Sequence, residues 1–291
     1  MNKPSRKFWL RAAWAGAAAV AVLAAVGGVA VGSGGTSGVI TVTCANTTAD
    51  ASTLQGDINN SAPGATVMIQ GTCLLTSGIT LLPDRTYDGG SASGTVLQQD
   101  GSMSYVLASA GYVDDYTTTA DPMTVRDLTV SCNDSGTTDG IIVLNWLADV
   151  EHDYVEDCGG SGIVDTNTNA AGIAITGTSV NSRFDNNMIT QSGQNGFEVI
   201  DSGNSVTDGY LVDNQIASSG EDAVYLQNSA GWDIYGNHLY GDGEGGISAS
   251  RLYQSTISDN IIEDFGAKQT SGTWYGITAT SQGAVGSVIS G

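Results

Sequence analysis

The second half of the chain repeats one short motif, in which an asparagine follows one apolar residue by three positions and precedes another by two. The asparagines of the four clearest copies, Asn187, Asn214, Asn237 and Asn260, are 27, 23 and 23 residues apart. A small residue followed by alternating apolar positions keeps the same spacing, at 196–199, 223–226, 246–249 and 276–279. This alternation predicts β-strands, and strands so short cannot each bury a face alone. We therefore predict that the repeats stack as the coils of a solenoid.

Two earlier copies of the motif carry aspartate at the asparagine position. Asp127 and Asp153 are 26 residues apart, whereas the next interval, from Asp153 to Asn187, is 34 residues. The excess predicts an insertion of about eight residues around Thr166–Ala171, bulging from its coil as a surface loop.

The recurring asparagine has a mechanical explanation. At a tight corner between two strands an asparagine tolerates left-handed backbone geometry, and its side chain bonds nearby backbone groups. Stacked coils would bring four such residues to a spacing of about 4.8 Å. We therefore predict a ladder of side-chain amides along one edge of the solenoid.

This pattern resembles the right-handed parallel β-helix proteins of the pectate lyase superfamily, over about residues 48–291. The segments 53–60, 63–73 and 78–81 look like the short capping helix and first strands of that family. The resemblance implies an all-β fold, a right-handed single-stranded parallel β-helix with a short N-terminal helix that closes the apolar column. Leu54 and Ile58, four residues apart, would share the buried side of that helix.

The segments that precede and end this domain carry their own signals. Residues 1–11 are basic and residues 12–31 carry no charge, so we predict a secretory signal over 1–32, with an uncleaved anchor as the alternative. A linker and first strand would occupy 33–47. Residues 286–291 repeat the residues before Asn260 and stop one position short of the next asparagine, so we expect the β-helix domain to be incomplete there.

The four cysteines are expected to form disulfides, because an exported chain meets an oxidising environment. Cys132 and Cys158 each follow a motif aspartate by five residues, so they would lie in neighbouring coils at a distance that suits a disulfide. Cys44–Cys73 follows by elimination. No pair has the short spacing of a structural zinc half-site.

The charge balance excludes some partners. The chain has 9 basic and 30 acidic residues, and loss of the signal, with four of the basic ones, changes the net charge from −21 to −25. Such a chain repels phosphate backbones and anionic membranes. We therefore expect a secreted protein that binds neither nucleic acid nor, after signal removal, a membrane.

Candidate functional residues gather on one predicted sheet. Alternation directs Phe197, Val224, Ile247 and Ile277 inward and Glu198, Tyr225, Ser248 and Thr278 outward. Paired carboxylates beside aromatic rings suit sugars, because rings stack on sugar faces while acids protonate a glycosidic oxygen and activate water. The catalytic candidates are Glu221 and Asp222, followed by Glu244 and Glu198. The substrate-binding candidates are Tyr225, Asn195, Trp274 and Tyr275.

A finer resemblance supports one of these candidates. Residues 219–224 look like the Asp-Asp motif of polygalacturonase-type hydrolases of the superfamily, whereas Asn195 stands where another catalytic aspartate would be. The His-Gly motif has lost its histidine, and the Arg-Ile-Lys motif is absent. His152 and His238 are expected to face solvent without a catalytic role.

Three functions follow, in order of preference. The first is a polysaccharide hydrolase using paired carboxylates, and the second is a non-catalytic glycan-binding or cell-surface module. The third is a lyase in which Ca²⁺, held by Asp242 and Glu244, bridges the anionic groove to a polyuronate. Uronate lyases of the superfamily generally use Arg or Lys as base, but the basic residues after the signal do not share a column: Arg85, Arg126, Arg183, Arg251 and Lys268.

Overall fold

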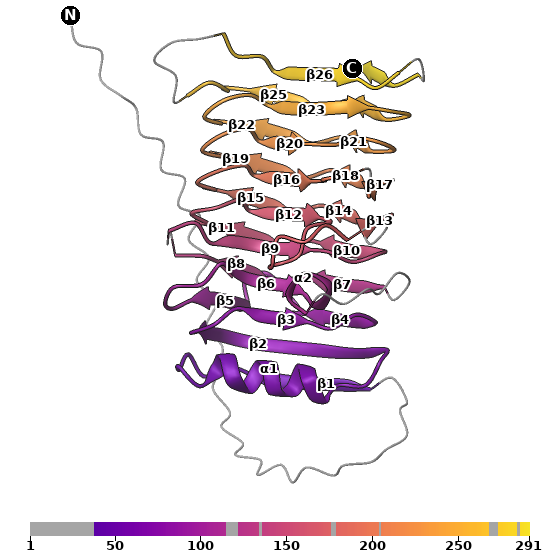
Figure 1. Cartoon of the computed structure of the whole chain (residues 1–291). Coiled ribbons are helices and arrows are strands. Elements are labelled where there is room, and N and C mark those ends of the chain that lie inside the picture. The colour runs from indigo at the N-terminus through magenta and orange to yellow at the C-terminus, as the bar shows by residue number, and fades with distance from the viewer. Residues whose placement is uncertain are drawn as a thin grey trace, which may run out of the picture. The chain divides into compact units, whose positions relative to one another are not determined.

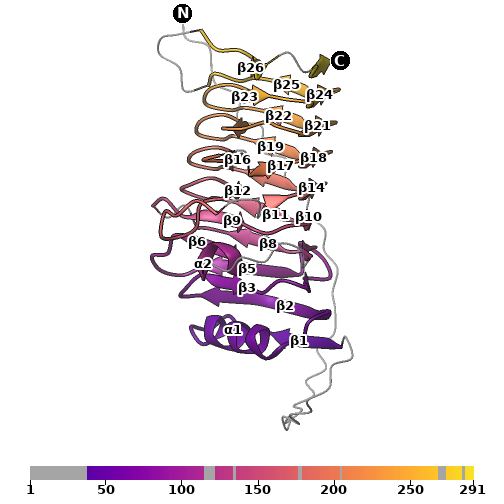
Figure 2. The same cartoon turned by 45° about the vertical axis from the view of Figure 1, so that its right-hand side comes forward.

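The computed structural model describes residues 38–114, 122–133, 136–175, 179–203, 205–267, 273–283 and 286–291. The predicted signal segment, 1–32, and Lys268 lie outside them. Over the described residues the chain winds into coils of short strands, each hydrogen-bonded in parallel to the coils before and after it (Figures 1 and 2). The predicted parallel β-helix is confirmed.

The coils present three faces, and their strands follow in chain order. The first face consists of β1 (Val39–Thr43), β2 (Ala65–Leu75), β4 (Arg85–Asp88), β7 (Met123–Arg126), β10 (Ala148–Glu151), β14 (Arg183–Asp185), β18 (Tyr210–Val212), β21 (Asp233–Tyr235), β24 (Thr256–Ser258) and β27 (Val288–Ser290). The second face begins in the long β2 and continues in β5 (Thr95–Gln99), β8 (Thr129–Ser131), β11 (Tyr154–Glu156), β15 (Met188–Thr190), β19 (Gln215–Ala217), β22 (His238–Tyr240) and β25 (Ile261–Glu263).

The third face is a separate eight-stranded sheet. Its strands are β3 (Ile79–Leu81), β6 (Tyr105–Ser109), β9 (Asp139–Val143), β12 (Ile163–Thr166), β16 (Phe197–Ile200), β20 (Val224–Leu226), β23 (Ile247–Leu252) and β26 (Ile277–Ser281). A small two-stranded sheet pairs β13 (Ser179–Val180) with β17 (Val206–Thr207).

Apolar side chains fill the column between the faces. The inward residues predicted on the third face, Phe197, Val224 and Ile247, are at most 1% exposed. Phe197 also packs against Phe184 and Trp232, with ring centroids 4.8 and 5.7 Å away.

A short helix closes the N-terminal end of the column. Helix α1 (Asp50–Asn60) packs on β1, β2 and β3, and its Leu54 and Ile58 are completely buried, as predicted from their spacing. No helix among the described segments is long and apolar enough to cross a membrane.

The asparagine ladder lies at the corner between the first and second faces. The Oδ1 of Asn214 accepts hydrogen bonds from the backbone N–H and the Nδ2 of Asn187, at 3.0 and 3.1 Å, and Asn214 donates to Asn237 in the same way. Asn237 repeats the pattern toward Asn260. The predicted ladder is therefore confirmed, and it links consecutive coils through a continuous chain of amides, of which Asn187, Asn214 and Asn237 are buried and Asn260 is partly exposed.

Two details of the predicted ladder are wrong. The left-handed backbone belongs to the residue before each asparagine, as at Asn186 with φ 54° and Asp213 with φ 54°, and not to the asparagine itself. The strand register also pairs Tyr154 with Thr129, so Leu128 and not Asp127 lies level with Asp153. Asp127, with φ 57°, is a corner residue.

Both predicted disulfides are present. The Cα atoms of Cys132 and Cys158 are 4.6 Å apart, and those of Cys44 and Cys73 are 4.8 Å apart. Strand register places Ser131 level with Glu156, so Cys132 lies level with Asp157 and the Cys132–Cys158 bond joins positions that differ by one residue. This difference follows from the shift at Asp127. The Cys44–Cys73 bond ties β1 to β2.

The predicted insertion is also present. Twelve residues separate β12 from β13, whereas five separate the equivalent strands β16 and β17 one coil later. Within this segment Thr168 and Ala174 form an antiparallel bridge, and the backbone N–H of Ala170 donates to the carbonyl of Tyr112 in helix α2 (Ala110–Val113). The insertion therefore folds back over the third face.

We expect Asn214→Ala to lower the free energy of unfolding by about 3 kcal/mol, because it leaves the buried N–H of Asn187 and the carbonyl of Phe184 without their side-chain partner. Denaturant unfolding followed by circular dichroism measures this loss. Met188→Ala is the control, since Met188 adjoins the ladder residue Asn187 in the neighbouring coil but is 38% exposed. Equal losses in the two variants would contradict a structural role for the ladder.

The buried carboxyl of Asp165 predicts an unusual pH dependence of stability. Burial raises the pKa of Asp165 to about 8, against a hydrogen bond from Ser179 that lowers it. The folded protein therefore holds a proton that the unfolded chain releases above about pH 4, so stability falls as the pH rises from about 4 to about 8. The loss from this one group is on the order of 5 kcal/mol.

Thermal unfolding across this pH range measures the effect. Asp165→Asn keeps the side-chain oxygen and removes the titration, so the midpoint should fall less with pH than in the unsubstituted protein. The exposed Asp100→Asn is the control and should leave the slope unchanged. A slope that Asp165→Asn does not reduce would rule out this assignment.

Candidate functional site

The outward side chains of the third face form one continuous row. Strand register places Val164, Glu198, Tyr225, Ser248 and Thr278 level with one another in successive coils. Neighbouring members of such a row are about 4.8 Å apart. The predicted stripe from Glu198 to Thr278 therefore exists, and its side chains are partly or fully exposed.

A cavity of about 210 Å³ opens beside the C-terminal half of this row. It contains four of the predicted site residues, Asp222, Glu244, Trp274 and Tyr275, which come from the turns that lead into β20, β23 and β26. The remaining lining consists of Gly245, Ile247, Ser248, Thr273 and Thr278. Two carboxyl groups and two aromatic rings thus share one concave site.

Asp222 is the most constrained group in this cavity. Its Oδ1 accepts a 2.7 Å hydrogen bond from the N–H of Gly245. A Cβ at position 245 would lie 2.8 Å from that oxygen, so glycine is needed for the close approach. Burial raises the pKa of the Asp222 carboxyl, and the charge of Glu244 raises it further, against the hydrogen bonds from Gly245 and Ser248. Asp222 therefore keeps its proton to higher pH than an ordinary aspartate.

Two predicted residues take different places. Asn195 is 4% exposed and its Oδ1 accepts the N–H of Asp222, so it holds the turn that carries Asp222 and does not line the cavity. Glu221 is exposed and lies outside the cavity lining. Their predicted functions as a substrate ligand and a catalytic residue therefore lack support from this geometry.

Glu198 belongs to a second carboxyl pair, whose other member, Asp139, was not predicted from the sequence. Ser161, which is completely buried, donates its hydroxyl to Glu198 Oε2 at 2.5 Å and its N–H to Asp139 Oδ1 at 2.7 Å. Burial raises the pKa of Asp139 to about 6, with a further contribution from Glu198 and an opposing one from the Ser161 N–H. Asp139 immediately precedes the small residue Gly140, as Asp222 precedes Ala223, so extending the repeat to this coil would have found it.

Asp139 lines another cavity, of about 140 Å³, on the same face. The two cavities are separated along the row by Glu198 and Tyr225, of which Tyr225 is half-buried. The other lining residues of this cavity come from α2, β9, β12, β16 and the insertion: Tyr112, Ile142, Val164, Thr166, Thr168, Asn169 and Ile200.

The predicted calcium pair is not supported. Asp242 is completely buried, and its Oδ1 accepts the N–H of Ser219 at 2.9 Å, so it faces the interior while Glu244 lines the open cavity. Burial raises the pKa of Asp242 to about 7, against hydrogen bonds from Ser219, and a protonated carboxyl is a poor calcium ligand.

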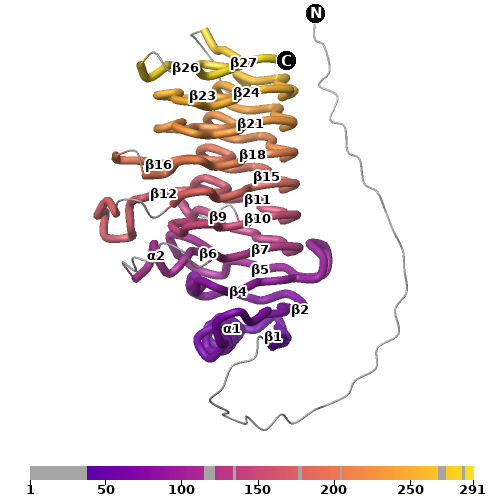
Figure 3. Tube along the Cα trace, turned by 90° about the vertical axis from the view of Figure 1, so that its right-hand side faces the viewer, coloured from indigo at the N-terminus to yellow at the C-terminus, as the bar shows by residue number. Residues whose placement is uncertain are grey.

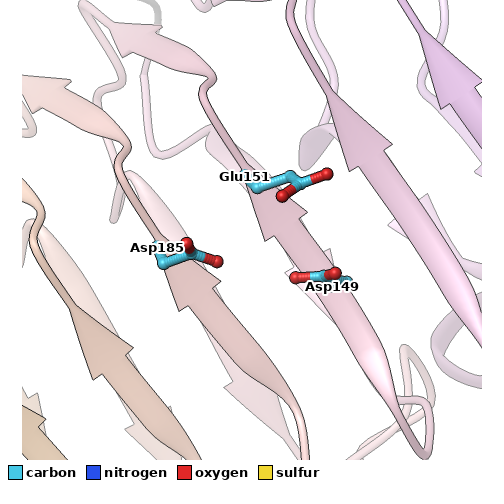
Figure 4. Close-up of side chains that lie close together, drawn as sticks. All are labelled: Asp149, Glu151 and Asp185. Atoms are coloured by element: carbon cyan, nitrogen blue, oxygen red, sulfur yellow. The ribbon is translucent and has the colours of Figure 1, made fainter.

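The acidic groups that do cluster lie elsewhere. Within the described part of the chain, one set of three potential metal ligands has its oxygens within 4.8 Å, namely Asp149, Glu151 and Asp185 on the outer side of β10 and β14 (Figure 4). Arg183 pairs with Asp185 at 3.0 Å, and Arg126 lies 3.8 Å from Glu151. Arg183 is thus a counter-ion of this acidic cluster.

Neither histidine lies near the two cavities. His152 is on a corner with its side chain 52% exposed, and His238 is 42% exposed, with its Nε2 2.9 Å from Glu263 Oε1 on the second face. The predicted surface positions are confirmed.

Comparisons with known proteins agree on the architecture. Residues 154–290 match the family described as a right handed beta helix region. No curated protein sequence matches the chain. Among solved structures, an alginate lyase from Paenibacillus sp. str. FPU-7 superposes with a TM-score of 0.53 at 16% identity, covering 77% of this chain and 80% of that one. The Dettilon tailspike protein gives a TM-score of 0.51 at 13% identity, covering 76% of this chain and 50% of the other. At these identities the likeness is one of fold.

Proposed function

We propose that this right-handed parallel β-helix protein, which has the pectate lyase-like fold, is an exported polysaccharide hydrolase with its active site in the Asp222–Glu244 cavity. The observation that carries the proposal is that this cavity brings a carboxyl with a raised pKa together with a second carboxyl and two aromatic rings. Glycoside hydrolysis uses a carboxyl with a raised pKa as proton donor beside a second carboxylate, and aromatic rings offer flat surfaces for sugar rings.

The geometry suggests a role for each residue. Asp222, whose pKa is raised by burial, would donate a proton to the glycosidic oxygen as the bond to the leaving sugar breaks. Glu244 would take the proton of the attacking water. Trp274 and Tyr275 would stack on the sugar rings that flank the scissile bond. Gly245 and Asn195 would position Asp222 through backbone hydrogen bonds.

Two further observations support parts of this proposal. One structural neighbour is an alginate lyase, which makes a polysaccharide a reasonable ligand class and places alginate in any substrate panel. The two disulfides favour an oxidising, extracellular location. The cavity lining supplies two carboxyl groups, which favour hydrolysis over a lyase reaction.

The test incubates the full-length protein with alginate, polygalacturonate, xylan, starch and a β-1,3-glucan, and follows both reducing ends and unsaturated-uronate absorbance. We expect new reducing ends without that absorbance, and a rate that falls as the pH rises through the pKa of Asp222. Glycan binding without cleavage would instead favour the non-catalytic module. Uronate absorbance would favour the lyase.

Substitutions in the cavity then identify its groups. Asp222→Asn should lower kcat/KM at least about 100-fold with little change in binding, because the proton donor is lost. Trp274→Ala should mainly raise KM. Asp233→Asn on the first face is the matched control and should leave both constants unchanged. Full activity in Asp222→Asn would exclude this cavity as the active site.

A further inference from the structure

The row of outward side chains on the third face is open at one end and covered at the other. Glu198, Tyr225, Ser248 and Thr278 reach solvent, whereas Ala108, Ile142 and Val164 face the same way and are at most 3% exposed. Residues on the outer side of a sheet have so little solvent exposure only when another part of the chain covers them. Figure 3 shows α2 and the segment after β12 on the side of the molecule that carries β16 and β23.

The cover is a packed wall. Ala108, Ile142 and Val164 form a satellite apolar cluster with Tyr105, Tyr112, Val113 and Ile200. The ring of Tyr112 meets that of Tyr105 edge to face, with centroids 5.8 Å apart. The insertion is tied to this wall by the hydrogen bond from Ala170 to the carbonyl of Tyr112. A polymer lying along the row would therefore meet a solid obstacle at Val164.

The cavity that contains Asp139 lies at this obstacle. Its walls are Tyr112 of α2 and Thr168 and Asn169 of the insertion, and its floor is Ile142, Val164 and Ile200. Its volume of about 140 Å³ is well below the roughly 300–1,000 Å³ of pockets for drug-sized ligands, so it suits one sugar ring and not an oligomer. From Val164 to Ser248 the row advances three strands, or about 14 Å.

We infer that the cavity of Asp139, Tyr112 and the insertion is a chain-end subsite, which seats the terminal sugar residue of a polysaccharide whose following residues run along Glu198 and Tyr225 toward the Asp222–Glu244 cavity. Tyr112 and the apolar floor would contact the ring, and the Asp139 carboxyl would bond its hydroxyl groups. The inference rests on the proposed function. It adds that the protein engages chains at their ends, a short and fixed distance from the reacting bond.

Chain-end recognition can be measured without catalysis. A panel polysaccharide that the protein binds or cleaves is separated into long and short size fractions, and Asp222→Asn binding is measured at equal polymer mass by isothermal titration calorimetry. If the protein binds chain ends, the number of binding sites on the polymer equals the number of chains. At equal mass the short fraction contains more chains, so it should bind more protein per gram, by the ratio of the long to the short chain length. Equal capacity per gram would overturn the inference and leave the proposed function intact. No binding and no cleavage of any panel member would overturn both.

An excision variant tests the wall. Because Thr168 and Ala174 are paired across the insertion, residues 169–173 can be replaced by Asn-Gly, a two-residue turn that keeps this bridge. The cluster around Tyr112 stays in place, so this variant removes the insertion's side of the cavity alone. The dependence of binding capacity per gram on chain length should weaken, and cleavage should produce more mixed fragment sizes than in the unaltered protein. An unchanged chain-length dependence in a folded variant would contradict the insertion as part of the chain-end subsite.

A matched pair of substitutions tests Asp139. Asp139→Asn keeps the oxygen that accepts the Ser161 N–H and should weaken binding of a short oligosaccharide about tenfold. Asp149→Asn, on the outer side of β10, is the control. Burial raises the pKa of Asp149 to about 6 as well, but Asp149 lines neither cavity of the third face. Equal affinities in the two variants would exclude Asp139 from the subsite.

Discussion

Parallel hydrogen bonding between successive coils is the constraint on which the rest of this structure depends. Each strand can pair only with the equivalent strand one turn earlier and one turn later, so residues at equivalent positions are forced into rows about 4.8 Å apart. A row of apolar residues becomes a core, and a row of amides becomes a ladder. A row of mixed residues becomes a surface whose composition changes from coil to coil, and both cavities of the third face lie beside such a row.

The ladder shows how strictly the corners obey this constraint. The amide-to-amide bonds all point the same way along the axis, because each Nδ2 donates to the Oδ1 of the next asparagine, and each Nδ2 also donates to a backbone carbonyl of the preceding coil. The residue before each asparagine takes the left-handed conformation that turns the chain, and the backbone N–H of the asparagine then donates to the next asparagine of the ladder. One residue per coil thus supplies hydrogen-bond partners for the buried polar groups of this corner.

Much of this was predictable from sequence, because a repeat converts spacing into spatial neighbourhood. The ladder from Asn187 to Asn260, the Cys132–Cys158 disulfide and the gathering of Asp222 with Glu244 follow from that rule. The Cys44–Cys73 disulfide follows by elimination, and the burial of Leu54 and Ile58 follows from helix spacing and the family resemblance. The rule failed where the repeat is imperfect: it aligned Asp127 with Asp153, whereas Leu128 lies level with Asp153. The direction of Asp242 could not be deduced, because strand alternation does not extend through a turn. The cavity of Asp139 depends on α2 and the insertion, which have no counterpart in the other coils as far as the structure describes them.

The buried aspartates change the meaning of the chain's acidity. Burial raises the pKa of Asp153 well above its usual range, that of Asp165 to about 8 and that of Asp242 to about 7. At neutral pH the carboxyls of Asp165 and Asp242 are wholly or partly uncharged, and Asp153 takes an asparagine's place in the ladder, with its Oδ1 accepting the N–H of Leu128. The formal charge of −21 therefore overstates the electrostatic field of the folded protein. An anionic polymer approaching the groove would meet less repulsion than residue counting implies, and the unfolded chain would be the more acidic species.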